Sequence, residues 1–437
     1  MTCAVANAPA WCATGRGFLA GGGLLQFNSP PTTQEDARAA TQALIVDQVA
    51  PKTYTWTLSF QREFAKNYVL ELRYLGTKGQ NLPIQVRLNA ISVFEKHPEL
   101  VVPTYFTNAA VPATVSLTAP SVQDFWDVSD LRYSAEGFVG GLVSAFPGVG
   151  NSIYHAGSVE LKRRFSKGLF MMANYTWSRT IDDSTNELFS SLVNPRRPQN
   201  PYNLKNERGL SALDMPHKFS LSWTYEIPKM FSTNSFANKM VDGWQISGSY
   251  LAQTGQPITA LAGQDANGDF DAAGDRALLN PNGSGLTGTR VNFVLRDPST
   301  GKTSIVTSVA DDGSDDVNVV GYVAANPNAK FVVAMPGTPD DGKRVGRNTI
   351  RTLGLNNWNI SILKNFKVQE QKEFQFRAEF FNAFNHRQFS LGLPSYEQST
   401  DNALSSSYAN VSALQFLDAG QFSGGNRTVQ LSLKFVF

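Results

Sequence analysis

The sequence has no long apolar run. None of its 437 residues lies in a stretch of about 18 apolar residues, the length that a transmembrane helix needs. The longest weakly polar stretch, Gly137 to Gly150, is broken by five glycines and by Pro147. This excludes a helical membrane span but leaves a β-barrel open, since only alternate barrel residues face lipid and the mean hydropathy stays low. That mean is −0.22 here.

An excess of one charge and a cysteine framework are also missing. The 38 Lys and Arg residues nearly balance 36 Asp and Glu residues, which argues against a nucleic-acid partner. The two cysteines, Cys3 and Cys12, are compatible with a disulfide or with two free thiols, so they do not settle the compartment. No basic segment followed by an apolar core opens the chain, as a signal peptide requires.

Catalytic motifs are absent from the sequence. His97, His155, His217 and His386 are scattered without the HExxH spacing of a metalloprotease. There is no GxSxG elbow, and the glycine-rich stretch before residue 150 lacks the Lys-Ser/Thr of a phosphate loop. We therefore expect no enzyme.

Aromatic residues, in contrast, are abundant at 11%, and they alternate with polar residues. The last eleven residues, 427–437, place apolar side chains on one face and polar ones on the other, with Val436 the single exception. This period of two predicts a strand with one apolar face. Eight further segments of similar length show the same alternation. The nine predicted strands are 53–62, 67–76, 154–165, 169–177, 218–227, 244–252, 356–366, 374–380 and 429–437.

The connections between these segments alternate in length. Short turns follow every odd-numbered strand but the last, and long segments at about 80–152, 182–216, 254–351 and 385–426 follow the even-numbered ones. Outer-membrane barrels have short periplasmic turns and long external loops, whereas a soluble β-sandwich has short turns at both ends. The predicted fold is all-β: part of an antiparallel transmembrane β-barrel, residues 52–437, with long extracellular loops and an extracellular, truncated N-terminal segment, 1–51. Two patches, 291–295 and 331–334, are expected to be strands within the longest loop.

This topology makes further predictions. Tyr175 and Trp177 fall at the external end, and Phe435 and Phe437 at the periplasmic end, the positions of two aromatic girdles. Nine strands leave two open edges, which the backbone cannot tolerate in lipid. We therefore expect a fragment in which the Val429–Phe437 edge does not pair with the first strand. Inward charges are expected to form a cross-strand network: Glu71, Arg73, Glu160, Lys162, Arg377 and Glu379.

Six segments carry a family resemblance: RRFSKGL from 163, ANYTWSRTIDD from 173, GWQISG from 243, TGQP from 254, NWNIS from 357 and FRAEFFNAFNH from 376. Together they resemble the C-terminal barrel of Oar-like TonB-dependent outer-membrane transporters of the acidobacterial type. The resemblance implies a barrel of about 22 strands, filled by a plug and powered by TonB and the proton-motive force. The sequence departs from the family in having no plug, TonB box or regulatory domain.

One loop carries a candidate metal site. Asp265, Asn267, Asp269 and Asp271 place oxygen atoms at alternate positions, and Asp275 adds a carboxylate. This spacing suits Ca²⁺, a hard cation, as a structural ion that stiffens the loop. The twelfth position holds an arginine where an EF-hand has Glu, and a solvated acidic loop remains the alternative. A second acidic cluster, 311–316, lacks the spacing and is expected to be solvated.

The expected function is uptake of an unidentified ligand, of the siderophore, oligosaccharide or peptide class, across the outer membrane of a Gram-negative cell. Expected partners are outer-membrane lipid, the barrel-assembly machinery through the strand Val429 to Phe437, and TonB through a plug that this chain lacks. The alternatives are a non-transporting outer-membrane structural or adhesion protein and a secreted β-rich carbohydrate-binding protein.

Overall fold

The computed structural model describes fourteen stretches of the chain. They are residues 32–39, 45–98, 102–107, 110–116, 131–138, 143–185, 197–228, 242–309, 318–338, 344–369, 372–387, 409–414, 416–418 and 425–436. Cys3, Cys12, Phe437 and the acidic cluster 311–316 lie outside them.

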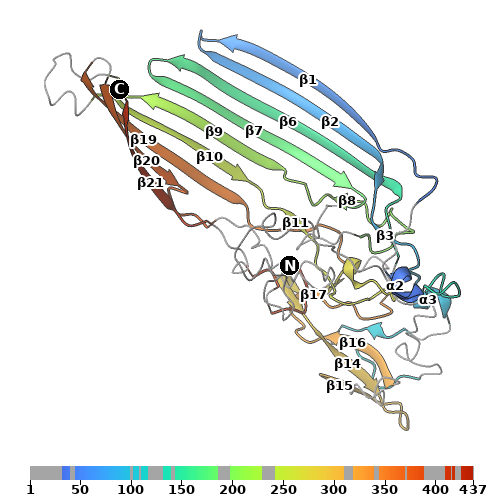
Figure 1. The fold of residues 1–437 in the computed structure, drawn as a ribbon. Helices are drawn as coiled ribbons and strands as arrows, with labels where there is room; N and C mark the ends of the chain where they lie inside the picture. Colours follow the sequence, from blue (N-terminus) through green and yellow to red (C-terminus); the bar gives the residue numbers. More distant parts are fainter. Residues whose placement is uncertain are drawn as a thin grey trace.

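One large antiparallel sheet dominates the fold (Figure 1). Its nine long strands lie side by side in sequence order, and each coincides with one of the nine predicted segments. A tenth short strand, β8 (Gly209–Leu210), pairs with the end of β7. The long strands are β1 (Lys52–Phe64), β2 (Tyr68–Pro83), β6 (Gly148–Ser166), β7 (Leu169–Asp182), β9 (His217–Glu226), β10 (Trp244–Gln253), β19 (Leu355–Gln369), β20 (Lys372–Phe381) and β21 (Thr428–Val436).

The pairing register gives this sheet one apolar and one polar face. Leu58 lies opposite Tyr74, Tyr74 opposite Gly157, and Gly157 opposite Trp177, so the apolar positions of neighbouring strands meet at one level. Directly paired residues share a face, because successive side chains alternate across a strand. We call the surface that carries these residues the apolar face.

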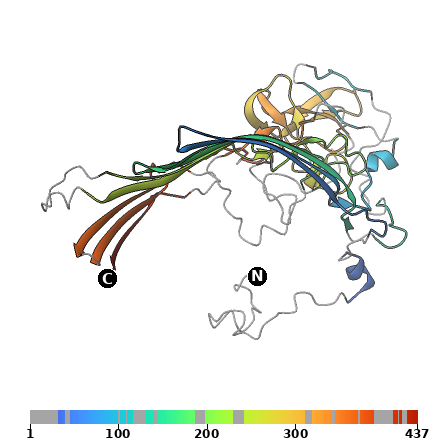
Figure 2. The ribbon, with the colours of Figure 1, turned by 90° about the horizontal axis from the view of Figure 1, so that it is seen from above.

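Both edges of the sheet are open within the described residues. Strand β1 pairs only with β2, and β21 pairs only with β20. All thirteen residues of β1 and all nine of β21 are exposed. The prediction that β21 does not pair with residues 53–60 is confirmed. Figure 2 shows the sheet as a curved open layer rather than a closed ring.

Tight turns gather at one end of the sheet, which we call the turn end. The β6–β7 turn has two central residues, Lys167 and Gly168, with φ of 50° and 79°. Positive φ at both positions is the type I′ geometry that matches the twist of a two-residue hairpin. A Cβ atom on Gly168 would lie 2.3 Å from the carbonyl oxygen of Glu226, whose N–H donates to the Gly168 carbonyl. Only glycine fits there.

The long connections assemble at the opposite end, which we call the loop end, and we call their described parts the loop unit (Figure 1). The longest predicted loop, 254–351, holds more strands than the two predicted patches, because this stretch folds into small sheets with parts of other connections. Of the two predicted patches, 291–295 lies within β14, and 331–334 overlaps β17. Two of these sheets have two strands: β11 (Pro257–Ile258) pairs with β18 (Ile350–Arg351), and β3 (Val86–Arg87) pairs with β5 (Ser144–Ala145). In a third sheet the order is β12 (Leu278–Leu279), β17 (Ala329–Val332), β13 (Ser284–Thr289). In the fourth the order is β15 (Thr303–Val306), β14 (Val291–Arg296), β16 (Val319–Ala324), β4 (Thr104–Tyr105).

The loop unit also holds the main hydrophobic core. Ile258, Val332 and Ala334 are fully buried and pack with residues from three further segments, among them Val411. In the described residues, helical structure is limited to α2 (Gln34–Ala39), α3 (Val93–Lys96) and the 3₁₀ turn η3 (Ala272–Gly274). No helix in the described part of the chain is long and apolar enough to span a bilayer. The sheet therefore has little core of its own, and its apolar face stays open.

Replacing Gly168 by alanine is expected to destabilise the β6–β7 hairpin by about 1–3 kcal/mol, because the new Cβ meets the Glu226 carbonyl at a left-handed backbone position. The temperature at which heat-modifiable gel migration is lost should fall. Gly157→Ala is the matched control, since nothing lies within 4 Å of its Cβ position. Equal transition temperatures for the two variants would contradict the turn geometry.

Candidate functional site

Buried arginine–carboxylate pairs tie the loop unit together and to the sheet. Arg197 holds Asp271 with two nitrogens, one of them 2.7 Å from Oδ1, and the exposed fractions of the two side chains are 4% and 11%. Arg347 pairs with Asp182 at the end of β7. Other pairs are Arg351 with Asp214 and Arg276 with Glu207. Each joins segments far apart in sequence, so the loops are held as one body.

The predicted metal loop lies inside this network. The Asp265 carboxylate accepts the N–H groups of Gly268, Asp269 and Phe270 at 2.7, 3.1 and 2.6 Å. Asp271 caps η3 by accepting the Ala273 N–H. The alternation of Asp and Asn thus produces successive turns in which side chains accept hydrogen bonds from the following backbone.

Burial and mutual repulsion mark the carboxylates of this loop. Burial raises the pKa of Asp265 and, with the Asp265 charge, raises the pKa of Asp269 well above its usual range. Burial, followed by repulsion from Asp265, raises the pKa of Asp275 to about 8, although the Arg344 guanidinium opposes the shift. Arg344 Nη1 lies 3.7 Å from Asp275 Oδ1, too far for a hydrogen bond, so desolvation dominates.

The structure therefore brings the predicted ligands close enough to raise one another's pKa values, but one of them forms an ion pair with an arginine. Asp271 is engaged by Arg197, and Asn267 donates to the Gln199 carbonyl. Within the described residues, no group of three or more His, Cys, Asp or Glu side chains is arranged to hold a metal ion. Calcium binding by Asp265, Asn267, Asp269, Asp271 and Asp275 stays a prediction.

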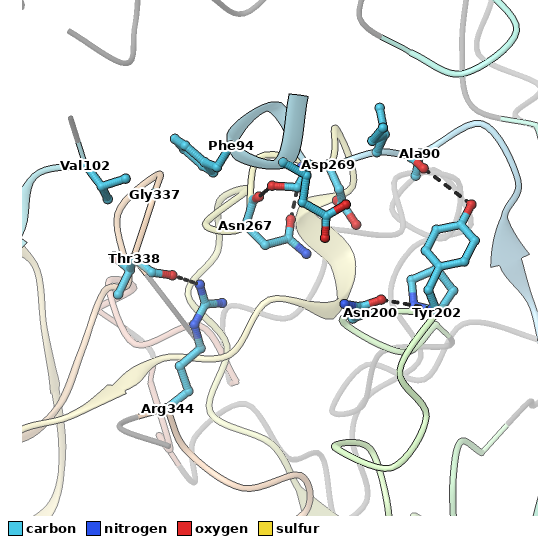
Figure 3. Close-up of a pocket in the computed structure, with 14 residues that line it drawn as sticks. Ala90, Phe94, Val102, Asn200, Tyr202, Asn267, Asp269, Gly337, Thr338 and Arg344 are labelled. Atoms are coloured by element: carbon cyan, nitrogen blue, oxygen red, sulfur yellow. Dashed lines mark hydrogen bonds between the residues drawn. The ribbon is translucent and has the colours of Figure 1, made fainter. Parts of the chain in front are cut away.

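A cavity of about 300 Å³ opens beside this loop. Figure 3 shows that Asn267 and Asp269 of the loop lie near Arg344 on one side and near Asn200 and Tyr202 on the other. The walls come from three of the long connections, the first of which contributes α3. The lining residues are Ala90, Ile91, Ser92, Phe94, Glu95, Val102, Asn200, Pro201, Tyr202, Asn267, Asp269, Gly337, Thr338 and Arg344.

Several groups in this cavity are held in place by their neighbours. The Tyr202 hydroxyl donates to the carbonyls of Leu88 and Ala90 at 3.1 and 3.4 Å. The Arg132 guanidinium lies 4.5 Å from the centre of the Tyr202 ring. Arg344 donates to the Thr338 carbonyl. A ligand with polar groups around an apolar body fits such a mixed wall.

Sequence reasoning missed Asn200, Tyr202 and Arg344, because no local pattern marks them. They come from connections without periodicity, and only the tertiary fold brings them to one cavity. The loop beside them was found through its Asp and Asn spacing.

The predicted inward network is wrong in its connectivity. Arg73 pairs with Glu71, and Arg377 with Glu379 at 3.8 Å, two residues apart on one strand rather than across strands. The register places Glu71 opposite Glu160, which explains why Glu71 turns to its own strand. These residues do share the polar face.

The predicted girdle residues that the structure describes lie where expected relative to the strand ends. Trp177 of β7 is near the loop end, beside His217 of β9. Phe435 of β21 stacks on Phe374 of β20 near the turn end, with ring centroids 4.7 Å apart. The four histidines remain scattered; His155 and His217 each contact a tyrosine hydroxyl at 2.8 Å.

Comparison with known families agrees with this architecture. The model of the outer membrane beta barrel domain matches residues 5–430, nearly the whole chain. The chain belongs to this outer membrane β-barrel family. It is therefore a protein of the cell outer membrane.

Solved structures with a similar fold include three outer-membrane proteins. The transporter YddB from Escherichia coli has 8% identity and a TM-score of 0.35, over 91% of this chain and 34% of its own. The ferripyoverdine receptor of Pseudomonas aeruginosa has 10% identity and a TM-score of 0.33, over 89% of this chain and 27% of its own. The ferric enterobactin receptor of Pseudomonas aeruginosa has 9% identity and a TM-score of 0.36, over 89% of this chain and 32% of its own. The chain thus spans about a third of their length. No curated protein matches the sequence.

Replacing Arg197 by alanine is expected to destabilise the loop unit by about 3 kcal/mol, because the buried Asp271 carboxylate loses both hydrogen bonds from Arg197 and keeps only the more distant Arg87 guanidinium, whose Nε lies 3.8 Å away. Hydrogen exchange of the loop-unit amides should report the change. Arg73→Ala is the control, since its pair with Glu71 is exposed and should contribute less than about 1 kcal/mol. If the two variants exchange alike, the buried pair does not hold the loops.

Removing calcium is expected to make the loop unit sensitive to pH. The pKa of Asp275 is about 8 in the fold, against about 3.9 in an unfolded chain, so the native state binds an extra proton. Stability is then full below about pH 4 and is lost towards pH 8, by up to about 1.4 kcal/mol per pH unit. Hydrogen exchange of the Ala266 amide, which donates to Asp275, measures this loss.

Calcium at millimolar concentration is expected to reverse the loss, because it binds the ionised carboxylates. Asp265→Asn should abolish the calcium effect. The absence of calorimetric heat on adding millimolar Ca²⁺ at pH 8 would refute the predicted metal site.

Proposed function

We propose that this chain forms part of a TonB-dependent outer-membrane transporter of the Oar-like type, which takes up an unidentified ligand of the siderophore, oligosaccharide or peptide class. The observation that carries the proposal is an open-edged sheet in a member of the outer membrane β-barrel family. The Oar-like motifs in the sequence specify the type.

The open edges require further strands. In hydrocarbon, each unpaired backbone N–H or C=O costs several kcal/mol, so a spanning sheet must close. Strands β1 and β21 each leave one side without a strand partner in the described residues. A larger barrel, to which this sheet contributes nine long strands, meets that requirement. The polar face of the sheet then lines the lumen.

The loop unit supplies the ligand-contacting surface in this proposal. Its cavity combines the Tyr202 and Phe94 rings with the amides of Asn200 and Asn267 and the charge of Arg344. Siderophores, oligosaccharides and peptides all present hydrogen-bonding groups on a partly apolar frame, which such a wall accommodates. The proposal places the loop end outside the cell and the turn end in the periplasm.

Cross-linking in native outer membranes tests the proposal. The polypeptide that contains this chain is expected to form a formaldehyde adduct with TonB, and the adduct should decrease when a protonophore collapses the proton-motive force. An unrelated TonB-dependent receptor in the same membranes is the control. If that receptor forms the adduct and this polypeptide does not, the chain is a non-transporting structural or adhesion protein.

A further inference from the structure

The apolar face of the sheet carries charge of only one sign. The register places seven Lys and Arg side chains on it, whereas the described residues of the nine long strands put no Asp or Glu there. The polar face carries both signs, and the whole chain is nearly neutral at +2. Composition therefore does not explain the asymmetry. The cations are Lys52, Arg62, Lys78, Arg163, Arg179, Lys364 and Lys372.

Three of these cations, Lys52, Lys78 and Arg179, gather near the loop end. Lys52 and Lys78 lie on neighbouring strands, two residue levels apart, because Lys52 faces Gln80. Arg179 lies opposite His155, whose other neighbour is Gly76, two residues from Lys78. Strands are about 4.8 Å apart and each residue rises about 3.4 Å, so Lys52 and Arg179 lie about 20 Å apart with Lys78 between them, a span that suits the separate phosphate groups of one lipid rather than a single group.

These three side chains are exposed, and none forms a hydrogen bond or an ion pair within the described residues. The buried pairs of the loop unit engage other arginines. We call Lys52, Lys78 and Arg179 the rim cations. Unpaired cations on a surface that faces lipid need an anion supplied by the lipid.

A band of amphipathic rings lies on the turn-end side of the rim cations. Trp56 Nε1 donates to the Tyr74 hydroxyl at 3.4 Å, and this hydroxyl contacts His155 Nδ1 at 2.8 Å. Trp177, in the same band, is 60% exposed. Trp and Tyr rings gather at the level where acyl chains meet headgroups. The rim cations lie two to four residues beyond the band along their own strands, and therefore at headgroup depth.

We propose that the rim cations bind the phosphate groups of a phosphorylated lipid in the leaflet at the loop end of the barrel. The occupant is a lipid rather than free phosphate, because the ring band and the open apolar face continue directly from the cations and receive acyl chains. The absence of carboxylates from this face removes the competitor for the three cations. The inference requires only the outer-membrane location and not the proposed transport.

Native mass spectrometry of the full chain in a neutral detergent tests the proposal. The probes are a diphosphorylated glycolipid, its dephosphorylated form and inorganic phosphate. The protein is expected to retain the phosphorylated lipid. The triple variant Lys52→Gln, Lys78→Gln, Arg179→Gln should bind it about 100-fold more weakly, since each surface cation contributes roughly fivefold.

Lys218→Gln is the control, because Lys218 is an exposed lysine on the polar face, opposite Thr176 at the level of the ring band. It should bind the lipid as the unchanged protein does. Unaltered heat-modifiable migration would show that the triple variant folds. Three results would overturn the proposal: equal retention of the dephosphorylated lipid, unchanged binding by the folded triple variant, or displacement of the lipid by equimolar inorganic phosphate.

Discussion

The buried pairing of arginine with carboxylate is the interaction on which the loop unit depends. A buried carboxylate without a partner costs several kcal/mol, and each arginine here neutralises one that belongs to another connection. Arg347 joins the segment before β18 to the end of β7, and Arg197 joins the segment between β7 and β9 to the start of η3. Arginine suits this role because its planar group binds a carboxylate with two parallel hydrogen bonds. The connections at 182–216 and 254–351 thereby become one unit, which forms the cavity together with the connection at 80–152.

The sheet obeys a different constraint, set by the bilayer. Its backbone is satisfied by neighbouring strands, so the side chains are free to divide by face alone. The apolar side meets lipid without a packed core behind it. Strands β1 and β21 are exposed along their whole length because each has a neighbouring strand on one side only. The only cost of this arrangement is at the two edges, where pairing ends.

This difference explains what could be predicted from the sequence. Alternation is local, so residues 53–62 and 429–437 identify their own strands and faces without knowledge of neighbours. The loop unit depends on contacts between distant residues, such as Arg347 with Asp182, and no pattern in the sequence pairs them. The Asp265–Asp275 loop lies between these cases. Its spacing announces a turn rich in oxygen acceptors, but the capture of Asp271 by Arg197 depends on the tertiary fold.

The anchoring pairs also explain why the two edge strands of the sheet differ from the central strands. Arg347 and Arg351 fix the loop unit to the end of β7 and to the segment before β9, in the middle of the strand order. Neither β1 nor β21 takes part in such a pair with the loop unit among the described residues. Buried ion pairs with the loop unit therefore fix the central strands, whereas the edge strands depend on strand pairing and lipid. The rim cations on β1, β2 and β7 lie on the face of the sheet where the described strands carry no carboxylate, so the counter-charge that we propose for them is lipid phosphate.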